Sequence, residues 1–481
     1  MNRNKFWFGL LAFVLPILLK VVWYYNGMTT RPEIATPDYG KFTLPQPAFS
    51  TPETREAVVP TGKVILFDAA HTNLYDAGEI QPLVEALIRA GGRVEIHDGS
   101  SDLKTNLKYA SAFVVISPTL AYSAEEIQTV QKFVHSGGRL LVLSDATRGT
   151  SVNYDTGITE FIPDVNTINP VLAPYDLRFN FDYIYNIQEN EGNFRNVYFG
   201  DFGETDFTAD LGRVVLYGAH SIESDSGTLL LLGNRTTFSS LTDSNEGGLA
   251  AAALSAEGSV LAIGDFTFLS APYNKVEDNG LLVQRVVEFL LAGERTPGLD
   301  DLPYLFSQPV VSVLPVGDAQ LNAGTIPILA GVQSMLDKMG KKMEIVDETP
   351  ASGDVLVFGT ITSDEILKPY LDEFDITLDE SAEYIEIPGF GEVGPSGIGL
   401  VLFKPDRSGN TLVLLTDSAD NLPLLFNALV SEFSTSCVTS GNIAICSTSS
   451  GESSSEEVGE ETPVEEEAGG EKVTPTTTPA G

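Results

Sequence analysis

Positive charge is scarce in this chain of 481 residues, which has 28 lysine and arginine residues against 66 aspartate and glutamate residues. The formal net charge is −38, so the electric field around the protein repels phosphate backbones and anionic lipid headgroups. Part of this charge lies in residues 448–481, where nine glutamates face only Lys472. The rest of the chain is also acidic, and we therefore expect no nucleic-acid partner.

A glycine-rich phosphate loop is also missing. Two glycine pairs, Gly91-Gly92 and Gly137-Gly138, each follow a predicted helix and precede a predicted strand. A dinucleotide fingerprint needs the reverse order, with its glycines after a strand and before a helix. We interpret the first glycine of each pair as a left-handed helix C-cap, and we predict no cofactor.

Cysteine is rare, since the chain contains only Cys437 and Cys446. Both lie in a hairpin pattern with a Gly-Asn turn, and pairing of Ser440 with Ile443 places the two cysteines opposite each other. Such a non-hydrogen-bonded pair has its Cα atoms about 4.5 Å apart, where a disulfide fits. The alternative is two buried free thiols. A disulfide implies an oxidising compartment.

The longest hydrophobic run covers residues 6–25, in which Lys20 is the only charged side chain. Its 20 residues are enough to cross a hydrocarbon core of about 30 Å as a helix. Trp23 and the two tyrosines that follow it suit the membrane interface, where Lys20 can extend its ammonium group toward water. We predict a single-pass membrane anchor.

A cleaved signal peptide is the alternative to a retained anchor. No small-x-small cleavage site follows the run, and no cysteine for lipid attachment lies nearby. Arg3 and Lys5 precede the run and favour a cytoplasmic N-terminus, although Arg31 and Lys41 beyond it make the charge bias modest. We therefore predict a cell-membrane protein with most of its chain outside the cytoplasm.

The alternation of apolar runs predicts an α/β protein with two compact domains, which is the usual division for a chain of this length. Strands are expected at residues 64–67, 94–96, 112–116, 140–143 and 259–265, with helices near 79–89, 123–135 and 279–292 between or after them. This pattern predicts a doubly wound parallel sheet. Less regular strands are expected at 214–217 and 228–232.

A second, smaller α/β domain with a C-terminal hairpin is predicted after a linker at residues 296–303. Its expected strands are 310–314, 343–346, 355–358, 399–403 and 412–415, and its expected helices are 326–339, 363–374 and 420–433. The predicted organisation has five parts: cytoplasmic stub and anchor at 1–28, Pro/Thr-rich spacer at 29–61, first domain at 62–297, second domain at 304–447, and disordered acidic tail at 448–481.

Three motifs in the first domain carry a resemblance to a known family. They are Asp68 to Tyr75 after the first strand, Ser123 to Asp145 with its Gly-Gly-Arg, and Ala262 to Leu269. Together they resemble the domain-of-unknown-function family numbered 4350. That family is similar to the gliding-motility auxiliary component of ABC transporters and to a degenerate class I glutamine amidotransferase fold. The resemblance covers roughly residues 61–295. It implies an amidotransferase-like sheet and envelope or ABC transporter proteins as partners.

Class I amidotransferases carry a nucleophilic cysteine in a Gly-x-Cys-x-Gly turn after the strand that corresponds to residues 140–143 here. In this chain the turn reads Ser144-Asp145-Ala146-Thr147-Arg148, with neither the thiol nor the flanking glycines. The distal His-x-Glu pair is also missing, and Asp265-Phe266-Thr267 stands near its place. We therefore expect no thiol-based glutamine hydrolysis and name no catalytic residue.

Polar residues still gather where the predicted parallel strands end, and ligands of such sheets lie beyond those ends. The tentative ligand-binding residues are Asp68, His71, Asn73, Ser117, Ser144, Asp145 and Asp265. Their oxygen atoms and the imidazole suit a polar ligand or a metal, whose identity stays unknown. The alternative is that these residues cap helices and close turns.

The sequence thus predicts a membrane-anchored binding or scaffolding protein that is not an enzyme. A competing hypothesis is an envelope hydrolase or a metal-dependent ligand-binding protein that uses the loop of Asp68 and His71. A purely structural cell-surface protein is the third possibility.

Overall fold

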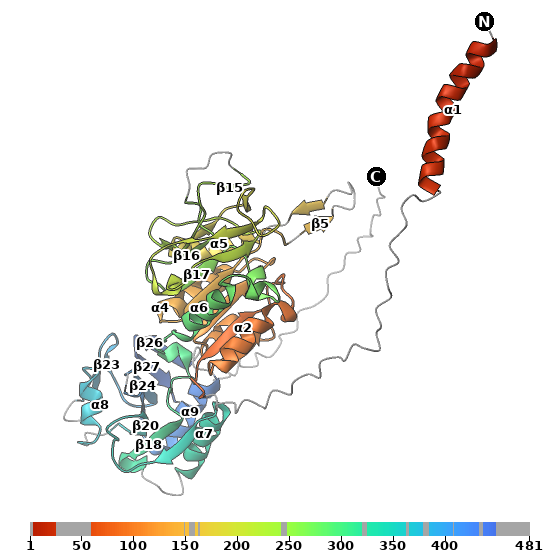
Figure 1. Cartoon of the computed structure of the whole chain (residues 1–481). Coiled ribbons are helices and arrows are strands. Elements are labelled where there is room, and N and C mark those ends of the chain that lie inside the picture. The colour runs from red at the N-terminus through yellow and green to blue at the C-terminus, as the bar shows by residue number, and fades with distance from the viewer. Residues whose placement is uncertain are drawn as a thin grey trace, which may run out of the picture. The chain divides into compact units, whose positions relative to one another are not determined.

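The computed structural model describes residues 3–25, 59–148, 150–152, 159–161, 164–241, 248–319, 325–361, 365–378, 384–406, 408–431 and 436–448. The chain divides into two compact units, residues 1–57 and 58–481, and the second unit contains both large sheets (Figure 1). The predicted spacer and acidic tail lie almost entirely outside the described residues.

The first unit contributes one helix, α1 (Arg3–Tyr25). Its segment Asn4–Tyr25 has a mean hydropathy of 2.1, and none of its side chains is buried. Among the described residues, α1 is the one helix that is long and apolar enough to cross a membrane, although a signal sequence has the same properties. Whether the helix is retained or cleaved stays a prediction.

The first sheet of the second unit is built from short strands, and the residues of its central strands are almost all buried, as expected for a sheet covered on both faces. Its seven strands run in the order β13-β16-β17-β4-β3-β1-β2. In chain order, the strands and main helices are β1 (Val64–Asp68), α2 (Ala77–Arg89), β2 (Arg93–His97), α3 (Leu103–Leu107), β3 (Ala112–Ile116), α4 (Ala124–His135), β4 (Arg139–Leu143), α5 (Val165–Leu172), β13 (Thr228–Leu229), β16 (Ala252–Leu254), β17 (Val260–Ile263) and α6 (Asn279–Leu291).

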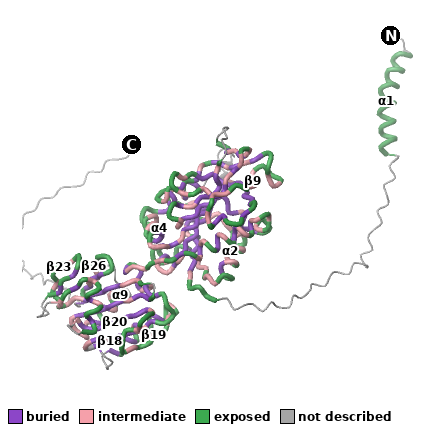
Figure 2. The backbone as a smooth tube through the Cα atoms, turned by 60° about the vertical axis from the view of Figure 1, so that its left-hand side comes forward, coloured by how far each residue is buried: buried purple, intermediate pink, exposed green. Residues whose placement is uncertain are grey.

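Alternation along the strands divides the core between the two faces of this sheet. Ile65 and Phe67 of β1 pack with the apolar faces of α2 and α6. Leu66, which points to the other face, packs in the cluster that contains residues of α3, α4 and α5. Figure 2 shows the buried backbone concentrated in the strands. The covered faces make this sheet doubly wound.

The prediction of a purely parallel sheet was incomplete. The five strands β2, β1, β3, β4 and β17 lie side by side and are parallel. Next to them, β16 pairs antiparallel with β17, and β13 pairs antiparallel with β16. Residues 255–259 alone connect β16 to β17, whereas a parallel connection needs a crossover of about a dozen residues or more. The predicted strand at 214–217 forms, as β11, but pairs with β9 outside the large sheet.

Five two-stranded pairs accompany the large sheet in this part of the chain. They are β5 (Thr150–Val152) with β6 (Thr159–Phe161), β7 (Arg178–Phe179) with β12 (Ile222–Glu223), β8 (Ile184–Asn186) with β15 (Thr237–Ser239), β9 (Asn196–Phe199) with β11 (Val214–Tyr217), and β10 (Asp201–Phe202) with β14 (Leu231–Leu232).

The second seven-stranded sheet has the order β19-β18-β20-β25-β24-β27-β26. The four strands β19, β18, β20 and β25 are parallel to one another. The strands β24, β27 and β26 follow, and each pairs antiparallel with the strand before it in this order. The elements are β18 (Val310–Val316), α7 (Ile326–Lys338), β19 (Lys342–Ile345), β20 (Asp354–Thr360), α8 (Lys368–Asp372), β21 (Thr377–Leu378), β22 (Ile385–Ile387), β23 (Gly391–Val393), β24 (Ile398–Lys404), β25 (Thr411–Thr416), α9 (Leu422–Ser431), β26 (Cys437–Ser440) and β27 (Ile443–Ser447).

This sheet is also buried on both faces. Leu356 and Phe358 of β20 pack with α7 and α9, whereas Val355 and Val357 pack with α8 and the small sheet β21-β22-β23. Of the helix predicted over 363–374, residues 363 and 364 lie outside the described residues, and the described part contains the helix α8 of 5 residues.

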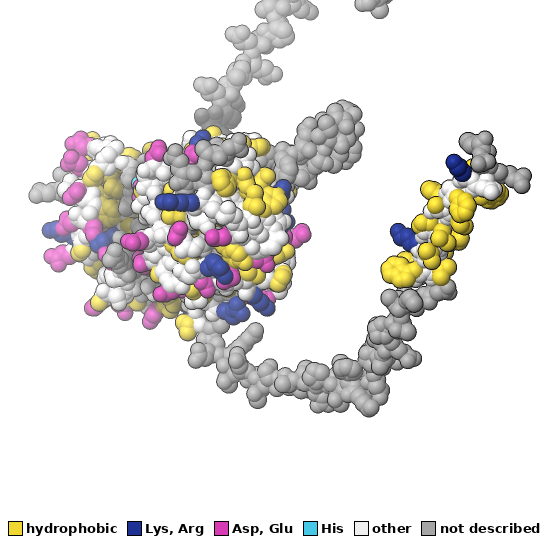
Figure 3. Space-filling model, turned by 45° about the horizontal axis from the view of Figure 1, so that its top comes forward, with side chains coloured by type: hydrophobic (Ala, Val, Ile, Leu, Met, Phe, Trp, Pro, Cys, Tyr) yellow, Lys and Arg dark blue, Asp and Glu magenta, His cyan; other side chains and the backbone are white. Residues whose placement is uncertain are grey.

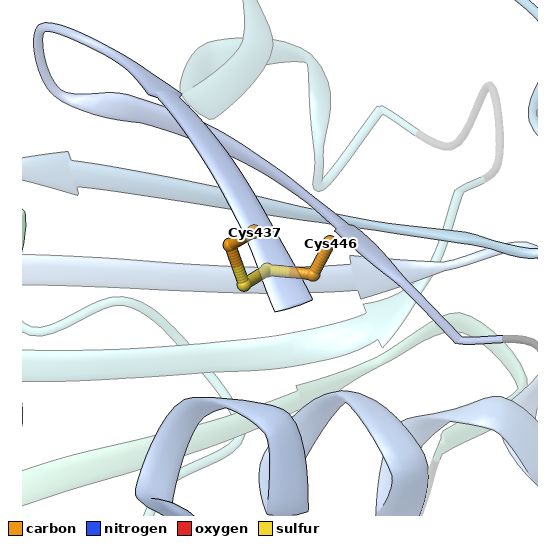
Figure 4. The surroundings of a disulfide bond; sticks show 2 residues. All are labelled: Cys437 and Cys446. Atoms are coloured by element: carbon orange, nitrogen blue, oxygen red, sulfur yellow. A yellow bond between two sulfur atoms is a disulfide. The ribbon is translucent and has the colours of Figure 1, made fainter. Parts of the chain in front are cut away.

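The C-terminal hairpin has the predicted register. Ser440 lies opposite Ile443 and Cys437 lies opposite Cys446. A disulfide joins the two cysteines, whose Cα atoms are 4.0 Å apart (Figure 4). It links β26, the edge strand, to β27, whose Cys446 is fully buried in the core beside α7 and α9.

Two glycines have the predicted left-handed C-cap conformation: Gly91 has φ +88° and Gly137 has φ +101°. A Cβ atom at Gly137 would lie 2.2 Å from the backbone oxygen of Glu294, just after α6. The glycine therefore lets the end of α4 contact the chain that leaves α6.

We predict that Gly137→Ala destabilises the first sheet far more than Gly192→Ala. Both glycines have positive φ, but a Cβ atom at Gly192 (φ +73°) meets nothing within 4 Å. Gly192→Ala should cost about 1–2 kcal/mol from backbone strain, and Gly137→Ala about 1–3 kcal/mol more from steric overlap. Thermal unfolding followed by circular dichroism measures the difference; equal melting temperatures would contradict the close approach.

Candidate functional site

The structure brings the predicted site residues to one edge of the first sheet, where its parallel strands end. Asp68 is the last residue of β1, Ser117 follows β3, Ser144 and Asp145 follow β4, and Asp265 follows β17 by two positions. All five are at most 2% exposed. They do not form one site, because their side chains divide among three separate hydrogen-bond networks.

The first network surrounds the carboxylate of Asp68. The Nδ1 atom of His71 lies 2.9 Å from its Oδ1, and the hydroxyl of Tyr122 donates to its Oδ2 at 2.6 Å. The amide of Asn73 donates to the same Oδ2 at 3.2 Å and to the carbonyl of Ile116 at 2.8 Å. The structure thus joins Asp68, His71 and Asn73 as predicted neighbours, and each anchors the loop after β1.

The imidazole of His71 is held on three sides. Its ring stacks on Tyr122 with centroids 3.7 Å apart, and its Nε2 lies 3.5 Å from Oε1 of Glu126. Burial by itself lowers the pKa of His71, but the hydrogen bond and charge of Asp68, with the charge of Glu126, raise that pKa above its ordinary value. The network therefore favours an imidazolium between two carboxylates.

The second network centres on a residue that the sequence did not single out, Asp164 at the start of α5. Ser117 donates a short hydrogen bond to its Oδ2, and Ser144 donates to its Oδ1 at 2.7 Å. The backbone N–H of Asp145 also donates to Oδ2, at 3.2 Å. The Nε2 of His220 lies 3.5 Å from Oδ1 of Asp164, and neither ring nitrogen of this buried histidine makes a hydrogen bond to a residue that the structure describes.

The third network pairs Asp145 with Asp265. Thr267 bridges them, since its hydroxyl donates to Asp145 Oδ2 at 3.1 Å and its backbone N–H donates to Asp265 Oδ1 at 2.8 Å. The backbone N–H of Tyr217 donates to Asp265 Oδ2 at 2.9 Å. The Nε of Arg148 lies 3.4 Å from Oδ2 of Asp145, and the same guanidinium pairs with Glu79 of α2.

Burial raises the pKa of both carboxyl groups in this pair. For Asp265, which no cation contacts among the described residues, burial and the charge of Asp145 raise the pKa to about 8. For Asp145 the upward effect of burial is opposed by Thr147, Arg148 and Thr267. Asp265 is therefore the member of the pair that holds a proton at neutral pH.

These networks limit the chemistry that the edge can perform. The hydroxyls of Ser117 and Ser144 both donate to Asp164, and no imidazole accepts a proton from either within the described residues. Ser117 has a positive φ of 42°, but its side chain is fully buried. Within the ranges that the structure describes, no three or more His, Cys, Asp and Glu side chains are arranged to hold a metal ion.

Some residues of the three networks were not among the predicted site residues, and the sequence carries a recognisable signal for only one of them. Glu126 stands in the Ser123-x-x-Glu126 capping box at the start of α4, a recognisable pattern. Tyr122, Asp164 and Thr267 have no such signal, because their distances to the strand ends depend on how the loops fold back.

A large open groove lies in the same part of the chain and contains none of the predicted site residues. Its volume is about 640 Å³, and its walls come from α5 and from the paired strands β7 and β12. Arg178 and Glu223 form an ion pair of 2.6 Å across those strands.

We predict that Asp265 makes the stability of the protein fall as pH rises. Its folded-state pKa of about 8 lies above the unfolded value of about 4. The folded state thus binds the extra proton between these values, and its stabilising effect is lost toward pH 8. Asp265→Asn should flatten the decline in melting temperature between pH 5 and pH 8.5. Asp182→Asn, which removes another buried carboxylate, is the control; identical pH profiles for wild type and Asp265→Asn would contradict the assignment.

Comparison with known proteins leaves the family open. No known protein-family model matches the chain, and no curated protein matches it. One similar solved structure is that of the mmIFT52 N-terminal domain, with 16% identity, a TM-score of 0.39, and coverage of 48% of this chain and 98% of that one. Another is a putative ThuA-like protein from Bacteroides uniformis, with 12% identity, a TM-score of 0.28, and coverage of 49% and 93%.

Proposed function

We propose that the chain is a membrane-anchored extracytoplasmic protein that binds or scaffolds other molecules and lacks thiol-based amidotransferase activity. Residues 6–25, within α1, are its anchor, and the unit of residues 58–481 is its working part. The observation that carries the proposal concerns the carboxyl edge, the edge of the first sheet where its parallel strands end: the polar side chains there form hydrogen bonds within the fold. The hydroxyls and carboxylates at that edge are buried and hydrogen-bonded to each other and to nearby loops.

The turn after β4 supports the absence of thiol chemistry. Ala146 stands where the Gly-x-Cys-x-Gly turn of the amidotransferase-like family has its nucleophilic cysteine, and the hydroxyl of Ser144 in the same turn donates to Asp164. A serine whose proton is held by a buried carboxylate, without a histidine base, is not activated for attack. By its resemblance to transporter auxiliary components, the protein would assist an envelope transporter or a surface assembly, with an amidotransferase-like domain as a binding body.

The location outside the cytoplasm is supported by two features of the termini. Arg3 and Lys5 precede the apolar run and would stay on the cytoplasmic side. The disulfide between Cys437 and Cys446 belongs to an oxidising compartment.

We predict that protease added to intact cells removes the part of the chain beyond α1, and that a maleimide reagent labels no thiol until a reductant is added. The reason is that both sulfur atoms are joined in one bond and lie outside the cytoplasm. Gel mobility after protease and after alkylation measures both. A chain that is fully protected in intact cells but cleaved in lysed ones, with two reactive thiols, would refute the proposed topology.

A second candidate function is an envelope hydrolase or metal-dependent ligand-binding protein that uses the loop after β1. The observation in its favour is the order Asp68, His71 and Glu126, in which a carboxylate orients Nδ1 and leaves Nε2 directed at a partly exposed side chain. A protonated histidine held in this way can donate its Nε2 proton as a general acid.

The two functions make opposite predictions for Asp68→Asn. If the loop is catalytic or binds metal, the purified chain should hydrolyse ester or glycan substrates or retain a metal, and Asp68→Asn should reduce this at least tenfold. On the binding proposal neither wild type nor variant turns over substrate in a broad screen. Asp182→Asn, a buried carboxylate in another network, controls for a general loss of stability.

A further inference from the structure

The strand pair β8 and β15 carries an exposed group of aromatic and aliphatic side chains, here named the aromatic surface. Its members are Phe181, Tyr183, Tyr185, Ile187, Phe194 and Phe238. Phe181 is 52% exposed and Ile187 is 73% exposed, whereas Tyr183, Tyr185 and Phe238 are half-buried. A contiguous group of this kind, unlike a single exposed apolar side chain, is typical of interaction sites. Figure 3 brings forward the end of the molecule that carries β15 in Figure 1, and hydrophobic side chains group on that face.

The rings hold one another in place. Tyr185 stacks on Phe238 of the opposite strand with centroids 5.8 Å apart, meets Phe194 edge to face at 6.2 Å, and lies 6.0 Å from Tyr183. The cross-strand pair follows from the register, in which Tyr185 faces Phe238. Such contacts order the side chains before any partner arrives, which lowers the entropy cost of binding.

The backbone beneath the surface is fixed as well. The N–H of Asn186 donates to the carbonyl of Phe194 at 2.8 Å, and the N–H of Gly218 donates to the carbonyl of Arg195 at 2.9 Å. The buried side chain of Asn186 donates to Asn234, to Thr236 just before β15 and to Thr237, the first residue of β15. The aromatic surface is therefore a preformed feature and not a loose loop.

Arg195 stands within this surface. Its guanidinium carbon lies 4.6 Å from the ring centre of Tyr183 and 5.4 Å from that of Phe194. Its Nε is buried and has no hydrogen-bond partner, and no carboxylate pairs with it among the described residues. Six other arginines of the same body pair with carboxylates, namely Arg93, Arg148, Arg178, Arg213, Arg285 and Arg295. Among the described residues, Arg89 and Arg139 also have no carboxylate partner, and Arg139 donates to the carbonyl of Gly258 instead.

A guanidinium that stacks on two rings and has no carboxylate partner among the described residues can pair with a carboxylate from another molecule. Stacking on two rings fixes the plane of the guanidinium and leaves its N–H groups free for a carboxylate in a two-bond geometry. Aromatic residues and arginine around a polar rim are also the composition of the most tightly binding parts of protein interfaces.

We propose that the aromatic surface docks a protein partner that presents an aspartate or glutamate carboxylate, flanked by apolar side chains, to Arg195. The inference rests on the proposed binding role and names its surface and the chemistry of its partner. It does not depend on the membrane anchor or on the carboxyl edge of the sheet.

The surroundings favour a protein over a lipid bilayer. Glu189 and Glu191 lie close to the members of the aromatic surface in the sequence, so the segment is acidic. Surfaces that lie on membranes are instead rich in lysine and arginine. Glu189 accepts a hydrogen bond from Asn234, and Glu191 accepts one from Asn196, so both carboxylates already have a partner within the chain.

The test uses the full chain in detergent micelles and a random library of displayed peptides. We expect the recovered peptides to share an acidic residue next to aromatic or aliphatic ones. Exchanging that acid for its amide, or Arg195→Gln in the protein, should each weaken binding at least tenfold, and combining both changes should weaken it little further. Arg195→Lys keeps the charge but loses the fork, and should lie between.

Arg178→Gln is the matched control, because Arg178 is a more exposed arginine of the same body that already pairs with Glu223. It should leave peptide affinity unchanged, and melting temperatures should show that all variants fold. Peptides that bind Arg195→Gln as well as wild type, or no recovered peptide, would overturn the docking surface while leaving a binding role elsewhere open.

A second experiment tests the remaining alternative, that the aromatic surface contacts a lipid bilayer. Both cysteines are joined in the disulfide, so Ile187→Cys provides a single thiol for an environment-sensitive dye. The dye should keep its aqueous emission in phosphatidylcholine nanodiscs and change it when a selected peptide is added. A change on transfer to the nanodisc alone would assign the surface to lipid and contradict the proposal.

Discussion

The burial of carboxylates at the ends of parallel strands is the constraint on which the rest of this structure depends. An ionised carboxylate without donors costs several kcal/mol in a protein interior. Asp68 and Asp164 avoid that cost by accepting hydrogen bonds from loops that are far away in sequence, and each such bond ties a loop to the sheet. Asp265 avoids it partly by holding a proton, because no cation reaches it among the described residues.

The polar side chains at these strand ends form hydrogen bonds to each other and to nearby loops. The edge where ligands of such sheets ordinarily bind is filled by its own side chains. The features that remain available to other molecules lie on the irregular strand pairs, above all the aromatic surface around Arg195.

Particular residues show how far sequence reasoning reached into the site. Asp68, His71 and Asn73 lie within a few positions of one strand end, so local spacing sufficed to group them. Ser117 and Ser144 follow adjacent strands, and both were expected at the edge, but the residue that joins them is Asp164. Asp164 reaches them only because α5 folds back over the sheet, which no local pattern encodes.

The sequence by itself determined the apolar N-terminal helix, the strands and helices with strong periodicity, the glycine caps and the cysteine register. Each of these depends on residues close together in the chain. Only the tertiary structure decided the antiparallel edges of both sheets, the three hydrogen-bond networks and the ring contacts of β8 with β15. These depend on which distant segments pack together, because burial and hydrogen-bond satisfaction are properties of the whole fold.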